Sequence, residues 1–276
     1  MSAMLPKVDR LIFLLFLFFI AIPFILPVAL PLPISPTTLK YKEILENLRK
    51  GDTIIWFVDA MIGAWAETAP GDIATFNFIL EQCREKGVKF VMVTTFHAES
   101  LAYAETIFKN YLNTEGLTYG VDYVYLGWIP GYESALAGIA GNLPAIVKTD
   151  YYGTPISQIP MMQNLHSIDD FAISGFTSST SPDPYIRQWS KKPIITNILA
   201  ANIGWIMPYV EKRIIVAYLA GVRGAAEFEY LIGRIGSATK LISAQSTAHI
   251  YAVALLIAAN IYYFGFVRRR GEVIKK

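Results

Sequence analysis

Five polar residues stand at the predicted ends of strands or starts of helices, where they could do chemistry. Asp59 ends one apolar run, and His97 and Glu99 follow a second. Glu133 begins a predicted helix after a third run, and Ser174 ends a fourth. These side chains could form a metal site or a general acid–base pair. Because their spacing matches no metal-ligand pattern, we expect turn and helix-capping roles instead.

The loops that follow the third and fourth apolar runs carry glycine and hydroxyl groups but no known fingerprint. Gly127–Gly131 reads Gly-Trp-Ile-Pro-Gly, which is neither a dinucleotide-binding motif nor a Walker A motif. The hydroxyl-rich Thr177–Ser181 lacks the Gly-x-Ser-x-Gly of a nucleophile elbow. The sequence therefore assigns no catalytic residue, and the cofactor is left unknown.

The densest polar and aromatic cluster is Thr149–Pro155, which contains Asp150, Tyr151, Tyr152 and Thr154. One interpretation is a turn in which Asp150 binds local amides and a glycine takes positive φ. The other is a rigid, tyrosine-lined recognition loop. The sequence leaves both interpretations open.

The central part of the chain alternates apolar runs with amphipathic stretches. This alternation predicts an α/β domain with an open, mainly parallel sheet and helices on both faces, Rossmann-like or flavodoxin-like. In such a sheet, ligands bind at the carboxyl ends of the strands. The predicted strands are Thr53–Asp59, Val88–Thr95, Tyr123–Gly127, Phe171–Ser174, Pro193–Leu199 and Ile214–Leu219. The predicted helices are Thr37–Lys50, Ile73–Lys86, Ser100–Asn113 and Glu133–Ala140.

Both ends of the chain are long enough and apolar enough to cross a bilayer. Leu11–Ile34 and Ala248–Val267 contain no charged residue, and about 20 apolar residues suffice for a helix to span the hydrocarbon core. We therefore predict transmembrane helices at 11–34 and 246–267, the first a retained anchor. They divide the chain into a tail at 1–10, an α/β domain at 35–245 and a basic tail at 268–276.

A third charge-free stretch, at 193–210, also raises the question of membrane entry. It contains Thr196, Asn197, Asn202 and Pro208, which are costly in lipid. We expect a core strand that leads into a helix.

The charge distribution argues against nucleic-acid binding. The two tails hold seven of the 24 basic residues, which leaves the rest of the chain with more acidic than basic residues. A polyanion-binding surface requires the opposite balance. Arg268–Arg270 follow the second apolar run, and Lys7 and Arg10 precede the first. By the positive-inside rule both termini are cytoplasmic, and the domain is extracytoplasmic in the cell membrane.

Two features predict association with a protein partner or a second copy. Gly221, Gly224 and the alanines beside it form a small-residue patch in the 221–229 region, which predicts close helix packing on the sheet or on another subunit. His249 and Asn260 are polar residues in the second span, and such residues tend to face protein.

Four segments resemble a family of uncharacterised prokaryotic membrane proteins that have one transmembrane helix at each end. They are Tyr119–Gly127, Thr149–Pro155, Asp169–Phe171 and Gly221–Glu229, the last with Phe228 where tyrosine is expected. The resemblance implies the same two-anchor architecture and no activity, ligand or catalytic residue.

The sequence therefore leads to a membrane-anchored α/β domain that acts as a non-catalytic binding or scaffolding subunit of a membrane complex. The alternative is an enzyme or small-ligand receptor that uses a pocket at the carboxyl ends of the strands, around Asp59, His97 and Glu133.

Overall fold

The structure is a computed structural model that describes residues 5–26 and 32–267, with the backbone alone at 5–8 and 266–267. The described residues leave out 1–4 in the predicted N-terminal tail, 27–31 within the predicted first span at 11–34, and the basic tail at 268–276. The chain forms two compact units. One is the domain, Leu32–Ala238, and the other, the helix pair, consists of the segments before and after it.

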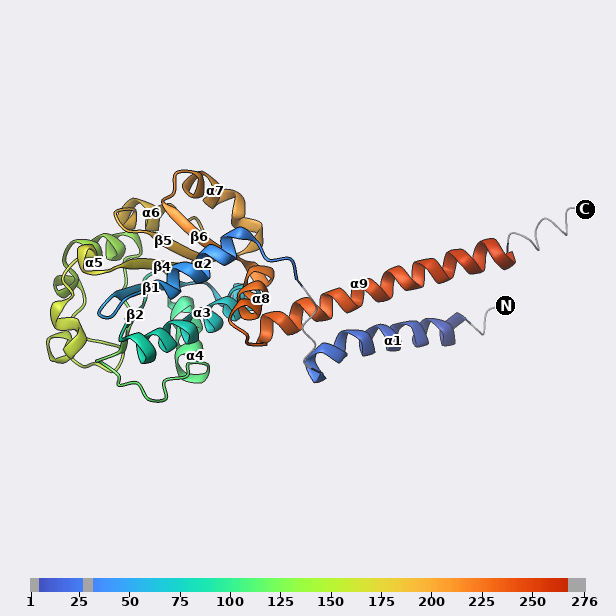
Figure 1. Ribbon diagram of the computed structural model, residues 1–276, viewed down its shortest axis with the longest axis horizontal. Coiled ribbons are helices and arrows are strands. Elements are labelled where there is room, and N and C mark those ends of the chain that lie inside the picture. Colours follow the sequence, from blue (N-terminus) through green and yellow to red (C-terminus); the bar gives the residue numbers. More distant parts are fainter. Residues whose placement is uncertain (1–4, 27–31, 268–276) are drawn as a thin grey trace, which may run out of the picture. The chain divides into compact units, whose positions relative to one another are not determined.

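The domain contains a six-stranded sheet in which every strand pairing is parallel (Figure 1). The spatial order β3-β2-β1-β4-β5-β6 is the doubly wound order found in Rossmann folds. The predicted parallel sheet is therefore confirmed. Its strands are β1 (Thr53–Asp59), β2 (Lys89–Thr94), β3 (Tyr123–Trp128), β4 (Ile173–Ser178), β5 (Ile194–Ile198) and β6 (Ile215–Ala220).

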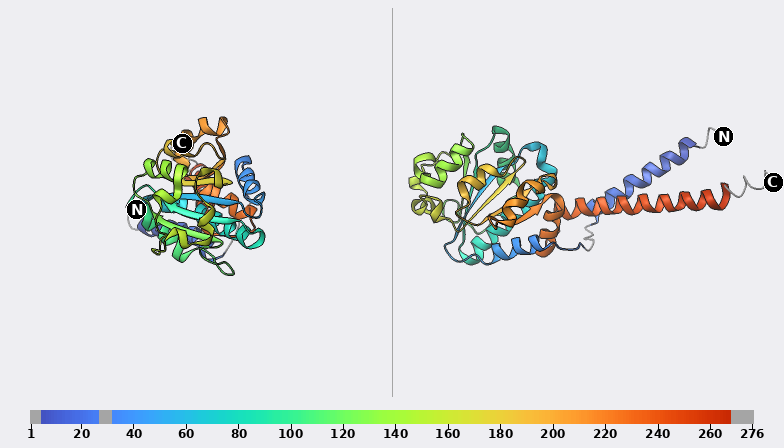
Figure 2. Two further views of the ribbon diagram at one scale, coloured as in Figure 1. Left: turned by 90° about the vertical axis from the view of Figure 1, so that its left-hand side faces the viewer. Right: turned by 90° about the horizontal axis from the view of Figure 1, so that it is seen from above.

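Helices cover both faces of the sheet (Figure 2). Ile54 and Trp56 of β1 pack with the face formed by α2, α3, α4 and α8, whereas Ile55 and Phe57 pack with α5, α6 and α7. Burial on both faces explains why the strands are continuous apolar runs rather than alternating ones. The helices are α2 (Pro36–Glu46), α3 (Trp65–Lys86), α4 (Ala98–Asn110), α5 (Glu133–Ile146), α6 (Asp183–Trp189), α7 (Ile203–Glu211) and α8 (Gly221–Leu231).

Two helices and one connection differ most from the sequence prediction. Helix α3 begins at Trp65, eight residues before the predicted start, because the chain continues in helical form through Pro70. Helix α5 extends to Ile146 across a non-helical Asn142. The connection from α5 to β4 contains three short 3₁₀ helices within 156–170, for which no sequence signal was recognised.

The predicted position of the fourth strand was wrong. Ser174 and Gly175 resemble a strand end, yet β4 runs from Ile173 to Ser178. Gly175 lies opposite Trp56 of β1, and a Cβ atom built on it would lie 2.1 Å from Trp56 Cε3. The glycine is therefore required by a ring packed across the sheet, and it does not end the strand.

The charge-free stretch at 193–210 belongs to the domain. It forms β5, which is completely buried, and most of α7. The predicted strand that leads into a helix is confirmed.

The helix pair consists of α1 (Leu5–Ile25) and α9 (Ser237–Tyr262), which continues as a π-helix over Tyr263–Val267. Thr247 Oγ1 donates a hydrogen bond to the carbonyl oxygen of Phe19 at 2.9 Å, and the Tyr251 hydroxyl donates one to the carbonyl oxygen of Ile12 at 2.8 Å. These contacts differ from the expected ones: His249 is exposed, and the Asn260 amide bonds within its own helix.

Among the described residues, one helix is long and apolar enough to cross a membrane, Ser237–Gly265. It begins nine residues before the predicted second span, because the polar segment before the apolar run continues the same helix. The N-terminal helix differs more from its predicted span. Its uncharged part, Leu11–Ile25, is about 22 Å long, which is shorter than a hydrocarbon core of about 30 Å.

Replacing Gly175 with alanine tests the packing that positions β4. The new methyl group would collide with the Trp56 ring, so we expect the free energy of unfolding to fall by about 2 kcal/mol or more. Thermal unfolding of the full chain in mild detergent measures the change. The matched control is Gly141→Ala, where the added methyl enters open space; equal effects of the two substitutions would contradict the packing argument.

Candidate functional site

The doubly wound strand order places a topological switch point between β1 and β4, where related folds bind ligands. Asp59 ends β1 and pairs in register with Ser178, which ends β4. The polar groups around these two residues therefore define the candidate site.

The Asp59 carboxylate is buried and accepts four hydrogen bonds. The Thr95 amide and hydroxyl donate at 2.6 and 2.7 Å, the Phe96 amide at 3.0 Å and the Tyr185 hydroxyl at 2.7 Å. Burial raises the pKa of Asp59 above its usual value, while these hydrogen bonds partly oppose the rise. Asp59 thus ties the end of β1 to the turn after β2 and to α6.

Three aromatic rings pack together beside Asp59. The Tyr132 ring lies 4.6 Å from the Phe96 ring and 6.1 Å from the Tyr185 ring, measured between centroids. Tyr132 has a φ of 48°, which is costly for a residue with a side chain. Its amide binds the Thr95 carbonyl oxygen at 3.1 Å, which fixes it in place.

Two further carboxylates accept hydrogen bonds from backbone amides at the same edge of the sheet. Glu99 accepts a hydrogen bond from the Ile62 amide in the turn after β1, at 2.9 Å. Glu67, in the first turn of α3, accepts one from the Ala200 amide after β5, at 3.3 Å. In dinucleotide-binding folds the first strand-to-helix turn presents its amides to phosphate. Here the chain's own carboxylates bind amides of these turns.

Two other predicted site residues at this edge, Glu133 and His97, contact neither Asp59 nor its hydrogen-bond donors through a hydrogen bond or ion pair given by the structure. Glu133 forms a two-pronged ion pair with Arg187, with both N–O distances 2.7 Å, and accepts a hydrogen bond from Gln188 at 3.1 Å. The Arg187 guanidinium lowers the pKa of Glu133 to about 2. His97 is exposed just before α4, with its ring 3.8 Å from that of Phe96.

No metal cluster unites these residues. Among the described residues, no group of three or more histidine, cysteine, aspartate or glutamate side chains could hold a metal ion. Ser174 lies near the beginning of β4, and its buried Oγ has no hydrogen-bond partner among the described residues. It is therefore remote in register from the carboxyl end at Ser178, and its predicted place in the site was wrong because the strand end was misplaced.

The 149–155 loop has the geometry of the predicted turn. Asp150 is buried, and its Oδ1 accepts hydrogen bonds from the amides of Tyr152 at 3.0 Å and Thr154 at 2.7 Å. Gly153 has a φ of 83°. The Tyr151 amide binds the carbonyl oxygen of Tyr125 at 2.9 Å, which joins the loop to the edge strand β3. Turn and rigid exposed loop are thus compatible descriptions of one segment.

The sequence analysis missed a second buried carboxylate, Asp72 on α3. It accepts hydrogen bonds from Thr177 at 2.5 Å, Asn197 at 2.8 Å and Tyr103 at 2.8 Å, which join α3 to β4, β5 and α4. Burial raises the pKa of Asp72 to about 7, although these three hydrogen bonds lower it. Helical spacing places Asp72 on the same face as the buried Thr68, a signal that could have identified it.

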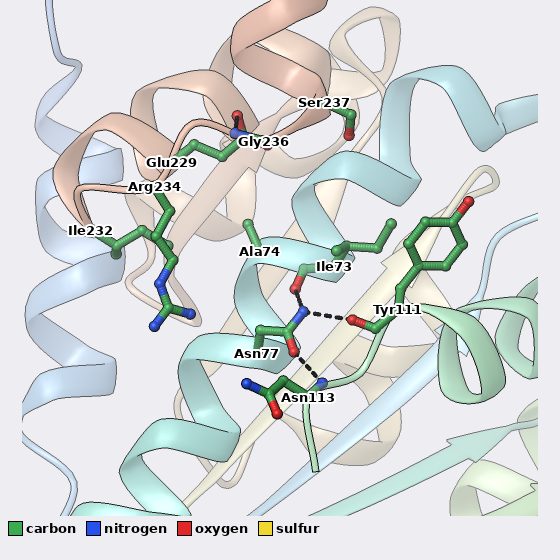
Figure 3. Close-up of a pocket in the computed structure, with 10 residues that line it drawn as sticks. All are labelled: Ile73, Ala74, Asn77, Tyr111, Asn113, Glu229, Ile232, Arg234, Gly236 and Ser237. Carbon is green, nitrogen blue, oxygen red and sulfur yellow. Dashed lines mark hydrogen bonds between the residues drawn. The ribbon is translucent and has the colours of Figure 1, made fainter. Parts of the chain in front are cut away.

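The structure also contains a pocket of about 280 Å³ beside α3 (Figure 3). On one wall Asn77 donates to the carbonyl oxygens of Ile73 at 2.8 Å and Tyr111 at 2.9 Å, and accepts from the Asn113 amide at 2.7 Å. The Asn77 amide thus holds the loop after α4 against α3. The lining residues are Ile73, Ala74, Asn77, Tyr111, Asn113, Glu229, Ile232, Arg234, Gly236 and Ser237.

The raised pKa of Asp72 gives a pH-dependent prediction. Its native pKa of about 7 exceeds the ordinary 3.8, so the folded state binds an extra proton between these values, and stability falls as the pH rises from about 4 to about 7. Asp72→Asn keeps an oxygen for Thr177 and Asn197, and its amide can donate to the Tyr103 hydroxyl. We expect the variant to be more stable than the native protein at pH 8, by at most about 4 kcal/mol.

Melting temperatures between pH 5 and pH 8 measure this difference, which should shrink toward pH 5. The control is Asp169→Asn, because Asp169 is exposed and pairs only across the surface with Lys191. A pH-independent difference between Asp72→Asn and the native protein would contradict the assignment.

Comparison with known proteins gives this chain no family: no family model matches it, and no curated protein matches it.

Proposed function

We propose that this chain is a membrane-anchored α/β domain that acts as a non-catalytic binding or scaffolding subunit of a membrane protein complex. The observation that carries the proposal is that the chain's own groups bind one another at the topological switch point, where related folds bind ligands. Asp59 is saturated by four donors, and Glu67 and Glu99 bind amides of the flanking turns. A substrate or cofactor at this edge would have to displace the contacts that satisfy the buried Asp59 carboxylate and those that Glu67 and Glu99 make with the exposed turns.

The binding surface we favour is the 149–155 loop together with the end of β3. The Tyr152 side chain is 64% exposed while its backbone is held by Asp150. A rigid, exposed aromatic side chain gives contact area at low entropic cost. Beside the loop is a recess of about 400 Å³, and Trp128 at its rim is 39% exposed. This combination suits an apolar or aromatic side chain of a partner protein.

The expected partner surface at 221–229 is less suitable. Gly221 and the residues from Gly224 to Glu229 are buried within the domain. Helix α8 packs against α3 and α2 of its own chain, so its small residues serve internal packing.

For the anchors, we propose that both α1 and α9 cross the cell membrane, with cytoplasmic termini and an extracytoplasmic domain. The length and composition of Ser237–Gly265 support the second span. The first span, α1, is supported by its pairing with α9, in which Thr247 and Tyr251 donate hydrogen bonds to carbonyl oxygens of α1. The resemblance to two-anchor prokaryotic membrane proteins agrees with this arrangement.

Photo-crosslinking in native membranes tests the binding surface. A benzophenone amino acid replacing Tyr152 should form an adduct of one defined mass with a partner or a second copy. The same group replacing Tyr230, which is 53% exposed on α8, is the matched control. Equal labelling at both positions, or a monomer without adducts, would overturn the proposal.

Cysteine accessibility tests the topology. The native Cys83 is buried, so it should not react with a membrane-impermeant maleimide. Lys212→Cys, at an exposed position of the domain outside the proposed binding surface, should react on intact cells, whereas Lys276→Cys should react only after permeabilisation. The reverse pattern would refute the orientation, and reaction of Lys276→Cys together with Lys212→Cys on intact cells would refute two spans.

A further inference from the structure

Helix α8 carries two buried carboxylates that flank a buried ring. Glu227 is 2% exposed, Glu229 is 3% exposed, and Phe228 between them is completely buried. The Phe228 ring packs edge-on against Tyr41 of α2 at 5.4 Å and Phe78 of α3 at 5.6 Å, measured between centroids. The packing of Phe228 against Tyr41 and Phe78 therefore fixes α8 in the core.

Glu227 holds the N-terminal end of the domain. Its Oε2 accepts hydrogen bonds from the Ser35 amide at 3.0 Å, the Ser35 hydroxyl at 2.6 Å and the Thr38 hydroxyl at 2.8 Å. Its Oε1 accepts one from Arg223 at 3.1 Å. Burial raises the pKa of Glu227, but these hydrogen bonds together lower it below its usual value. Ser35 lies three residues after Leu32, where the domain begins.

Glu229 holds the C-terminal end of the domain. Its Oε2 accepts a hydrogen bond from the Gly236 amide at 3.0 Å, and its Oε1 accepts one from the Ala238 amide at 3.1 Å. A Cβ atom on Gly236 would lie 2.2 Å from Glu229 Oε1, so the chain passes directly over the carboxylate. Ala238 is the last residue of the domain and the second residue of α9.

We propose that α8 couples the two ends of the domain, so that release of Ser35 from Glu227 also loosens the hold of Glu229 on Gly236 and Ala238. Release of Ser35 would take away two of the hydrogen bonds to a carboxylate that is 2% exposed, which is strongly unfavourable, and a shift of α8 that opens Glu227 to water would relieve this cost. Glu229 is on the same short helix and moves with it. Because packed interiors transmit such shifts, a change at the Ser35 end of the domain would reach the start of α9 through α8, in addition to the direct contacts between α1 and α9; this regulation rests on the proposed membrane anchoring.

Amide hydrogen exchange on the full chain in mild detergent tests the coupling. Glu227→Gln should speed exchange near Ser35, where its hydrogen bonds lie, and, through α8, also at 232–240, by at least about fivefold. Because coupling is reciprocal, Glu229→Gln should speed exchange at 35–39. The matched control is Glu133→Gln, which removes a carboxylate from an exposed ion pair and should change neither segment.

Exchange that speeds up only beside each substituted residue would overturn the coupling and leave two independent clamps. If Glu227→Gln fails to fold, Ser35→Ala removes one donor from the same oxygen and should give the smaller change in the same direction. The readout requires no partner. Loss of coupling with Tyr152 crosslinking intact would therefore reject this inference alone, and loss of crosslinking with coupling intact would reject only the binding proposal.

Discussion

A buried carboxylate must be surrounded by donors, and this requirement organises the domain. Asp59 joins the end of β1 to the turn after β2 and to α6. Asp72 joins α3 to β4, β5 and α4. Glu227 and Glu229 join α8 to the two ends of the domain. Each carboxylate brings together segments that are distant in sequence, and the cost of leaving it without donors makes those junctions specific.

The same requirement shapes the functional conclusion. A Rossmann-like sheet leaves amides and carboxylates at its carboxyl edge, and the buried ones among them must bind either a ligand or one another. In this chain Glu67 and Glu99 bind turn amides, and Asp59 accepts its hydrogen bonds from the neighbouring turn and from Tyr185. The fold is thus retained while the polar groups at its usual ligand position stabilise the domain. This is why we propose a binding surface elsewhere, at the exposed Tyr152.

Local signals in the sequence were enough to place most of the sheet, because strands buried on both faces are apolar runs bounded by turns. They failed at β4, where Gly175 resembles a strand end but accommodates the ring of Trp56. They also could not assign a role to Asp59. Its donors Thr95 and Tyr185 are 36 and 126 residues away in sequence, and only the folded chain brings them together. Asp72 was accessible to helical periodicity, but the predicted helix began one residue after it, at Ile73, whereas α3 begins at Trp65.

The proposed membrane segments meet the same requirement in lipid. Lipid offers no hydrogen bonds, so polar groups in a span must bind protein. Thr247 and Tyr251 do so by donating to carbonyl oxygens of α1, one helical turn apart on α9. The Tyr251 ring also packs against the Phe19 ring of α1, with 5.3 Å between the centroids. Helix α1 thus has a partner along its apolar length. A helix whose uncharged part is shorter than the hydrocarbon core gains most from such a partner, because pairing offsets the cost of hydrophobic mismatch. We therefore infer that α1, as a proposed anchor, acts as one half of a pair with α9.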